Sequence, residues 1–190
     1  MPYLNREQIL ALIKKKQIYS NNLIFNDQIQ PASLDLTLSY KCYRIKASFI
    51  PNNIKISKVI KELSLVSIDL NKNTLLEKNC IYLCELNEKL NLPHNIMGKS
   101  NPKSTTGRLD IFTRVITENG KECDYVNYNY RGKLYLEIIP QSFSIILKKN
   151  LSLNQIRFFK DSTTEDKIKH VNISVSIKKN EITAYKAKKI

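Results

Sequence analysis

Apolar and polar side chains alternate along short segments that recur at intervals of roughly ten residues. In residues 32–43 (ASLDLTLSYKCY), Leu34, Leu36 and Leu38 alternate with polar residues, which is the pattern of a half-buried strand. Further segments of this kind are SLVSIDL, CIYLCEL, IFTRVIT, KLYLEII, SFSIIL, NQIRFF and VNISVSI. Asn, Pro, Gly and Lys separate them. The spacing predicts an all-β sandwich or barrel with one or two helices, and argues against alternating strands and helices.

The N-terminus gives the clearest helix. Asn5 can cap it, and Gln8, three residues later, can complete a capping box. Ile9, Leu12 and Ile13 form an apolar stripe along one side. The chain has 190 residues, of which 42% are hydrophobic, so one domain with a substantial core is expected.

The net charge of +14 restricts the choice of partners. Such a balance suits nucleic acid, phosphate-bearing ligands or an anionic membrane. The lysines are scattered along the chain, however, so charge alone is weak evidence for a nucleic-acid surface. No apolar run approaches the ~20 residues of a membrane helix, and the N-terminus lacks the apolar core of a secretory signal. We therefore expect a soluble, cytoplasmic protein without a membrane partner.

The four cysteines, Cys42, Cys80, Cys84 and Cys123, include no CxxC pair. If NCIYLCEL is a strand, Cys80 and Cys84 lie about 13 Å apart on one face, too far for a disulfide and poorly placed for a shared metal. Buried free thiols in a reducing cytosol are therefore expected, and no protein metal site is predicted.

Two strand segments carry an acidic residue that packing does not require. Asp35, in QPASLD, lies on the polar face of its strand and is either a structural hydrogen-bonding group or a functional one. Glu137, in YRGKLYLEIIP, interrupts an apolar strand and shares a face with Tyr135 and Ile139. Taken alone, Glu137 is either an ordinary solvent-facing residue, the commoner case, or a pocket acid with a raised pKa.

A third stretch, GKSNPKSTTGRLD, combines hydroxyls, a lysine and glycines. Lys103, Ser104 and Thr105 precede Arg108 there. Hydroxyls, backbone donors and cations in one loop have the composition of an anion cradle, although solvated loops share that composition. The loop is not a Walker loop, because GxxxxGK[ST] is absent.

In this order, the three stretches resemble the deoxycytidine triphosphate (dCTP) deaminases of the trimeric dUTPase-like superfamily. The similarity runs from the N-terminal helix through IQPASLDLTL, NPKSTTGRLDIFTRVIT, YRGKLYLEI and LNQIRFF. The middle segment is most similar to the larger proteobacterial form, in which two such domains lie in tandem, and this chain would correspond to the first. The resemblance implies a mainly β, dUTPase-like barrel or jelly-roll-type fold. It would have an N-terminal helix at about residues 5–17, a barrel at about 30–178 and a basic C-terminal arm at about 179–190.

The same resemblance implies the substrate and how it is held. The activity is hydrolytic deamination of dCTP to dUTP and ammonia, with Mg²⁺ bound through the triphosphate, in a homotrimer whose sites lie between subunits. Lys103, Ser104 and Thr105 match triphosphate contacts, and Arg108 lines the same site. Asp124 falls near the family's sugar-side aspartate.

The catalytic roles implied by the resemblance fall on Glu137 as general base, with Arg108 and Ser104 beside it. Zinc deaminases attack cytosine with a metal-bound hydroxide and carry an HxE…PCxxC signature, which this sequence lacks. A metal-free route needs a carboxylate to take the water's proton and pass it to N3 and the leaving amine. Among apolar neighbours Glu137 would bind that proton readily, while Arg108 and Ser104 could hold the water and stabilise developing charge.

Three alternatives remain open. The chain could be a bifunctional dCTP deaminase and dUTP diphosphatase, an option that Asp124 keeps open. It could be an inactive remnant of a tandem-domain deaminase. It could also be a basic β-barrel that stacks nucleic acid on Tyr125, Tyr128 and Tyr130, although we do not expect nucleic acid as the partner.

Overall fold

The computed structural model describes residues 3–160. Its helical elements are α1 (Arg6–Lys14), the 3₁₀ turn η1 (Asn26–Gln28), α2 (Ile56–Leu63) and α3 (Ser104–Arg108). Its strands are β1 (Ile18–Ser20), β2 (Leu34–Ile45), β3 (Ser64–Asp69), β4 (Thr74–Leu76), β5 (Ile81–Asn91), β6 (Ile96–Pro102), β7 (Ile111–Thr117), β8 (Tyr125–Val126), β9 (Arg131–Pro140), β10 (Ile145–Leu147) and β11 (Ser152–Lys160). The expected mainly β fold with an N-terminal helix is confirmed.

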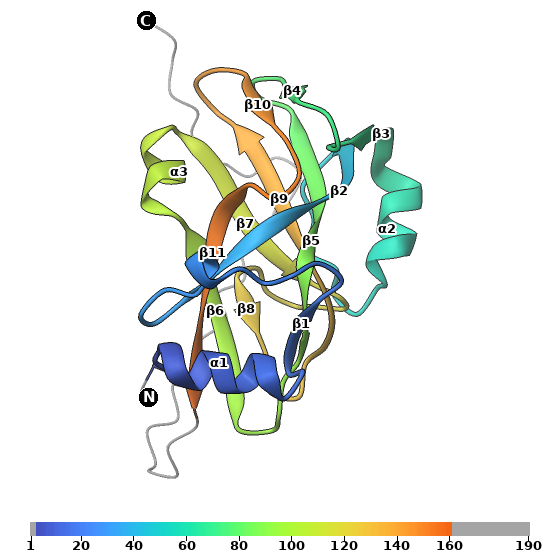
Figure 1. Ribbon diagram of the computed structural model, residues 1–190. Helices are drawn as coiled ribbons and strands as arrows, with labels where there is room; N and C mark the ends of the chain where they lie inside the picture. Colours follow the sequence, from blue (N-terminus) through green and yellow to red (C-terminus); the bar gives the residue numbers. More distant parts are fainter. Residues whose placement is uncertain (1–2, 161–190) are drawn as a thin grey trace, which may run out of the picture.

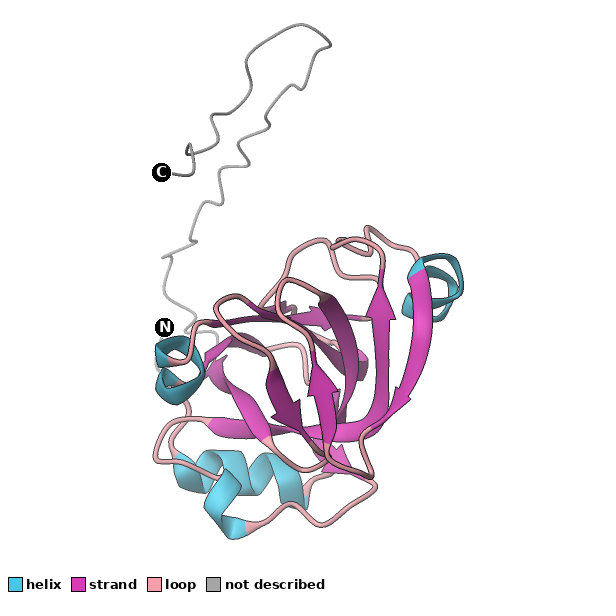
Figure 2. Cartoon of the chain, turned by 90° about the horizontal axis from the view of Figure 1, so that it is seen from above, coloured by secondary structure: helices cyan, strands magenta, loops and turns pink. Residues whose placement is uncertain are grey.

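One strongly curved antiparallel sheet forms the body of the molecule. Its strand order is β7-β9-β5-β2-β11-β6-β8, with β1 added to β5 and β3 added to β2, while β4 and β10 pair separately. Seen from above, the strands bend around a common interior (Figure 2). The helix α1 lies across one end of this barrel, and α2 lies outside it beside β2 and β3 (Figure 1).

Buried polar side chains join the two ends of the sheet. Thr113 of β7 donates to Asn154 Oδ1 of β11, and Asn154 Nδ2 donates to Ser100 Oγ of β6 at 3.1 Å. All three residues are buried. Because β7 and β6 lie near opposite ends of the strand order, these bonds close the barrel on the side where the main-chain ladder is open.

Apolar side chains fill both faces of the central strands. The larger cluster occupies the barrel interior and includes the leucines of β2. A smaller cluster, with Leu83, Ile116 and Tyr135, lies on the other face of the sheet and packs against α2. The central part of β9 is therefore covered on both faces, and a polar residue at its centre is buried.

The predicted N-terminal helix forms with its capping box, since Asn5 Oδ1 accepts from Gln8 N and Gln8 Oε1 accepts from Asn5 N. It ends at Lys14, short of residue 17, because Lys16 takes a left-handed φ of 54°. The half-buried pattern predicted for β2 is wrong. Asp35 and Thr37 are buried as well as the leucines, because other parts of the chain cover the polar face.

The segments predicted as strands within residues 3–160 all form strands. Cys80, however, precedes β5, so it does not share a strand with Cys84. All four cysteines are free thiols, and Cys42 and Cys84 are buried as expected. VNISVSI, the C-terminal arm and the end of the barrel expected at about residue 178 lie outside the described residues.

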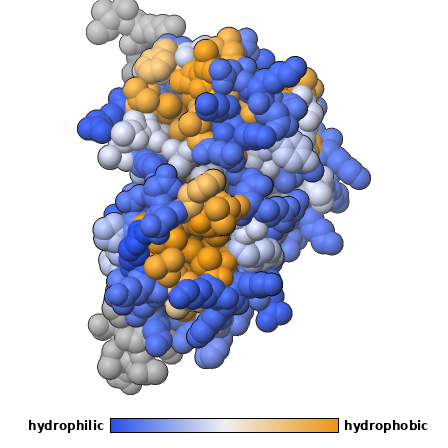
Figure 3. All heavy atoms as spheres, viewed as in Figure 1, coloured by the Kyte–Doolittle hydropathy of each residue, from blue (hydrophilic) through white to orange (hydrophobic). Residues whose placement is uncertain are grey.

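Two apolar areas interrupt the hydrophilic surface in the view of Figure 3. The upper one lies over β4 and β10, where Leu75 and Ile146 face each other in register and are both exposed. Leu109 and Phe112, next to α3, are exposed too. None of the helices within residues 3–160 combines the length and apolar character needed to span a bilayer.

Candidate functional site

The short helix α3 presents the predicted phosphate-binding residues. Thr106 is buried, and its hydroxyl donates to Leu153 O of β11 at 2.8 Å; Lys103 N donates to the same carbonyl at 2.9 Å. These two bonds hold α3 against the barrel, so that Ser104, Thr105 and Arg108 are exposed to solvent. The loop predicted from composition is therefore a strand end followed by one helical turn.

Asp35 and Lys103 connect two of the stretches singled out in the sequence. The Lys103 ammonium forms an ion pair with the Asp35 carboxylate, whose side chain is only 8% exposed. A pocket of about 370 Å³ opens beside this pair and is lined also by Gln30, Ser104 and Gln155. The pocket thus combines a cation, a hydroxyl and two amides, which are groups that bind anionic oxygen atoms.

Glu137 lies at the centre of β9, directly opposite Arg114 of β7. Its side chain is 0% exposed, and Arg114 donates to it from Nε to Oε1 at 2.7 Å and from Nη2 to Oε2 at 3.4 Å. Glu137 is therefore not the solvent-facing residue that is common on such strands. The expectation of purely apolar neighbours is also wrong, because a guanidinium faces the carboxylate across the ladder.

Asp124 lies beside this ion pair. Its Oδ1 accepts from Val115 N at 2.7 Å, and its own N donates to Val115 O at 2.8 Å, so both side chain and main chain are tied to β7. Burial raises the pKa of Asp124 to about 6, against the opposing effects of the Val115 hydrogen bond and the charges of Arg114 and Lys99.

The predicted site residues therefore form two groups. Lys103, Ser104, Thr105 and Arg108 lie on and before α3, whereas Asp124 and Glu137 flank Arg114. Within residues 3–160 no hydrogen bond or ion pair joins a side chain of the first group to one of the second.

Arg114 is the residue that the sequence reasoning missed. A signal for it exists, because IFTRVIT and LYLEII each contain a single charged residue, Arg114 and Glu137. Had the two strands been paired in antiparallel register, Arg114 would have fallen opposite Glu137, where opposite charges attract across a sheet.

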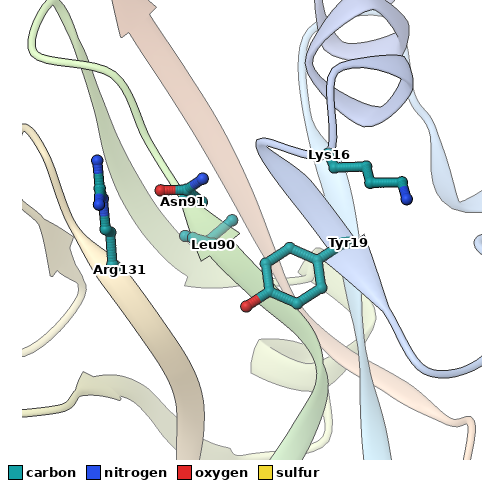
Figure 4. Close-up of a pocket in the computed structure, with 5 residues that line it drawn as sticks. All are labelled: Lys16, Tyr19, Leu90, Asn91 and Arg131. Atoms are coloured by element: carbon teal, nitrogen blue, oxygen red, sulfur yellow. The ribbon is translucent and has the colours of Figure 1, made fainter.

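A second pocket, of about 390 Å³, lies away from these residues. It is lined by Lys16, Tyr19, Leu90, Asn91 and Arg131, and Figure 4 shows the Tyr19 ring between the two cationic side chains. None of the predicted site residues lines it. In residues 3–160 no three His, Cys, Asp or Glu side chains are grouped closely enough to hold a metal ion.

Comparison with known proteins places the chain in a family. The family model for the 2'-deoxycytidine 5'-triphosphate deaminase (DCD) N-terminal domain matches residues 2–162. The crystal structure of 2'-deoxycytidine 5'-triphosphate deaminase from Agrobacterium tumefaciens is similar at 43% sequence identity and a TM-score of 0.79. That match covers 82% of this chain and 47% of the Agrobacterium chain, so the chain spans about half the length of that relative.

Weaker structural similarity extends to dUTPases. The enzyme from phage phi11 of S. aureus is 12% identical with a TM-score of 0.47, over 85% of this chain and 98% of its own. The EIAV dUTPase is 13% identical with a TM-score of 0.40, over 56% of this chain and 83% of its own. No curated protein sequence matches the chain. The family match and the Agrobacterium structure together show that this chain belongs to the family of dCTP deaminase N-terminal domains.

Proposed function

We propose that the chain hydrolyses dCTP to dUTP and ammonia, as a hydrolase acting on the C–N bond of a cyclic amidine. The observation that carries this proposal is the fully buried Glu137 carboxylate, held on a central strand in a domain of the dCTP deaminase family. A carboxylate buried in this way is shielded from bulk solvent and held in a fixed position. A general base requires such a fixed position relative to the water that it deprotonates.

The reaction can be written around Glu137. A water molecule donates a proton to the carboxylate while its oxygen bonds to C4 of cytosine. The carboxylate passes this proton to N3, which leaves C4 bearing both a hydroxyl and the amino group. The hydroxyl proton then passes to the amino group, the C4–O bond becomes a carbonyl, and the C4–N bond breaks to release ammonia. Arg108 and Ser104 would stabilise the charge that develops at the ring and hold the water.

Binding of the nucleotide would use the other residues. Lys103, Ser104 and Thr105 would contact the triphosphate beside the 370 Å³ pocket, and Asp124 would accept a hydrogen bond from the sugar. The donors near α3 are hydroxyls, amides and a lysine, and the nearby Asp35 carboxylate is paired. These groups would bind phosphate oxygens and would leave Mg²⁺ to the substrate. Mg²⁺ commonly binds through substrate phosphates and several waters, with few protein ligands.

We further propose a cytoplasmic homotrimer with active sites between subunits. Two features support shared sites. First, the residues on and before α3 make no side-chain hydrogen bond or ion pair with Asp124 or Glu137 within residues 3–160. Second, Leu109 and Phe112, which follow α3 in the sequence, are exposed apolar residues. Exposed apolar side chains of this kind are suited to a protein interface.

The test is an ammonia-release assay over the four deoxynucleoside triphosphates, with Mg²⁺. We expect turnover of dCTP alone, loss of ammonia release with retained nucleotide binding in Glu137→Gln, and full activity in Glu77→Gln, a surface control whose carboxylate also pairs with an arginine. Release of dUMP and pyrophosphate would indicate the bifunctional enzyme. Binding of dCTP by the wild-type chain without ammonia release would indicate the inactive remnant.

Shared sites have a test of their own. In mixed trimers of Ser104→Ala and Glu137→Gln chains, some shared sites would combine the intact Glu137 of the first variant with the intact Ser104 of the second. We expect the mixture, after dissociation and reassembly, to recover activity that neither variant has alone. A chain that scatters light as a monomer and still turns over dCTP would contradict shared sites.

A further inference from the structure

Arg114 is the one charged residue of β7, in the middle of the strand. Its partner Glu137 has 0% side-chain exposure, whereas the side chain of Arg114 is 21% exposed. The accessible part of the pair therefore belongs to the arginine. Of the two paired charged groups, only the guanidinium is open to solvent.

The two contacts of the pair are unequal. Nε lies 2.7 Å from Oε1, a strong charge-assisted hydrogen bond, while Nη2 lies 3.4 Å from Oε2, near the limit of a hydrogen bond. Oε1 is thus occupied. Oε2 retains the capacity to accept a proton from another group. A general base needs this arrangement, in which one oxygen is fixed and the other is available.

The surroundings of Arg114 restrict its position further. The neighbouring main chain on β7 is tied to Asp124 through Val115, and the charge of Arg114 acts on both Asp124 and Cys123. Phe112, on the same face of β7, places its ring 6.0 Å from the guanidinium carbon. The guanidinium is therefore in contact with both the Glu137 carboxylate and the Phe112 ring.

We propose that Arg114 is a positioning residue for the deamination: it fixes Glu137 through Oε1 and leaves Oε2 to take the proton from the attacking water. This inference rests on the proposed function. Arginine suits the role because its rigid, planar guanidinium can hold Oε1 from Nε in one fixed direction, with Nη2 only 3.4 Å from Oε2. Lysine would supply the charge but only one point of contact, so the carboxylate could rotate away from the water.

The decisive variant is Arg114→Lys, because it keeps the cation that the buried carboxylate needs and changes the geometry alone. We expect kcat for ammonia release to fall about 10²-fold, the effect of misplacing a reacting group by roughly 1 Å. KM for dCTP should stay close to wild type, since Arg114 positions the general base Glu137 and does not take part in nucleotide binding. Arg44→Lys is the matched control, because Arg44 pairs with Glu77 at the same 2.7 Å on the surface. Its kcat should equal that of the wild type.

Chemical rescue provides the second measurement. Guanidinium ion added at millimolar concentration should raise kcat in Arg114→Ala and leave Glu137→Gln inactive, with circular dichroism used to confirm that each variant is folded. An Arg114→Lys chain with wild-type kcat would overturn the inference while the deaminase assignment stands. A folded Arg114→Ala chain that guanidinium does not rescue would also overturn it. A wild-type chain that releases no ammonia would instead overturn the proposed function, and the inference with it.

Discussion

Replacing Asp124 by Asn should make the protein more stable at neutral and alkaline pH. Burial raises the pKa of Asp124 from 3.8 to about 6, so the folded protein disfavours the ionised form. The associated stability is present below pH 3.8 and is lost as the pH rises to about 6. Asn has no charge to ionise. It can keep the Oδ1 acceptor for Val115 N, and it tolerates the positive φ of 60° found at this position.

The magnitude follows from the gap between the two pKa values. About two pKa units correspond to roughly 3 kcal/mol, and because the side chain is partly exposed we reduce this to about 1–2 kcal/mol. Asp124→Asn should therefore exceed the wild type in free energy of unfolding by that amount at about pH 8, and by nothing near pH 4. Its affinity for dCTP should fall, because the proposed sugar acceptor is altered.

Urea unfolding at several pH values provides the measurement, followed by far-ultraviolet circular dichroism because the chain contains no tryptophan. The other titrating groups are common to both proteins, so the difference in unfolding free energy isolates Asp124. A difference that stays constant between about pH 4 and pH 8 would refute the reasoning, since only a titrating group at this position gives it a pH dependence.

Three further variants test how the fold is held together. Asn5→Ala removes the side-chain acceptor of Gln8 N, one of the two hydrogen bonds of the capping box, and should cost about 1 kcal/mol, seen as a lower urea midpoint with unchanged slope. Gly98→Ala places a Cβ 2.8 Å from Ile156 Cδ1 and should cost about 1–3 kcal/mol in the same assay; a variant as stable as the wild type would mean that Ile156 moves freely. Lys103→Met leaves the Asp35 carboxylate buried without its cation and should cost about 2 kcal/mol in the same assay. A variant as stable as the wild type would mean that the buried carboxylate does not need its cation.

Strand alternation was sufficient to predict most of the sheet. β7 occupies a segment that the alternation marks, because Ile111, Thr113 and Val115 on one of its faces are buried. β3 occupies another such segment, although none of its residues is buried. The short helix α2 was not predicted. It begins in a run of Asn, Ile and Lys that resembles a loop, and it is stabilised by burying Ile56 and Val59 against the outer face of the sheet. Contacts of that kind depend on the folded chain and leave no local signal.

The sequence grouped only those candidate site residues that lie close together along the chain. Residues that follow one another in sequence, such as Lys103 and Ser104, could be grouped from their spacing. The partner of Glu137 could not, because Arg114 reaches it through strand pairing across 23 positions of the chain. The cation that pairs with Asp35 likewise comes from Lys103, 68 residues away. Register between distant strands is what the local pattern leaves undetermined.

Cys42 and Cys84 face each other across β2 and β5, with their sulfur atoms 2.8 Å apart and no exposed surface. Burial raises the pKa of the Cys84 thiol well above its ordinary value, so hardly any reactive thiolate exists while the domain is closed. Cys80 and Cys123 are only partly covered. An alkylating reagent would thus label Cys80 and Cys123 first. It would reach Cys42 and Cys84 only when the residues that pack over β2 and β5 move away. The rate at which Cys42 and Cys84 are alkylated, followed by mass spectrometry, would therefore report how often the interior opens, without any introduced probe.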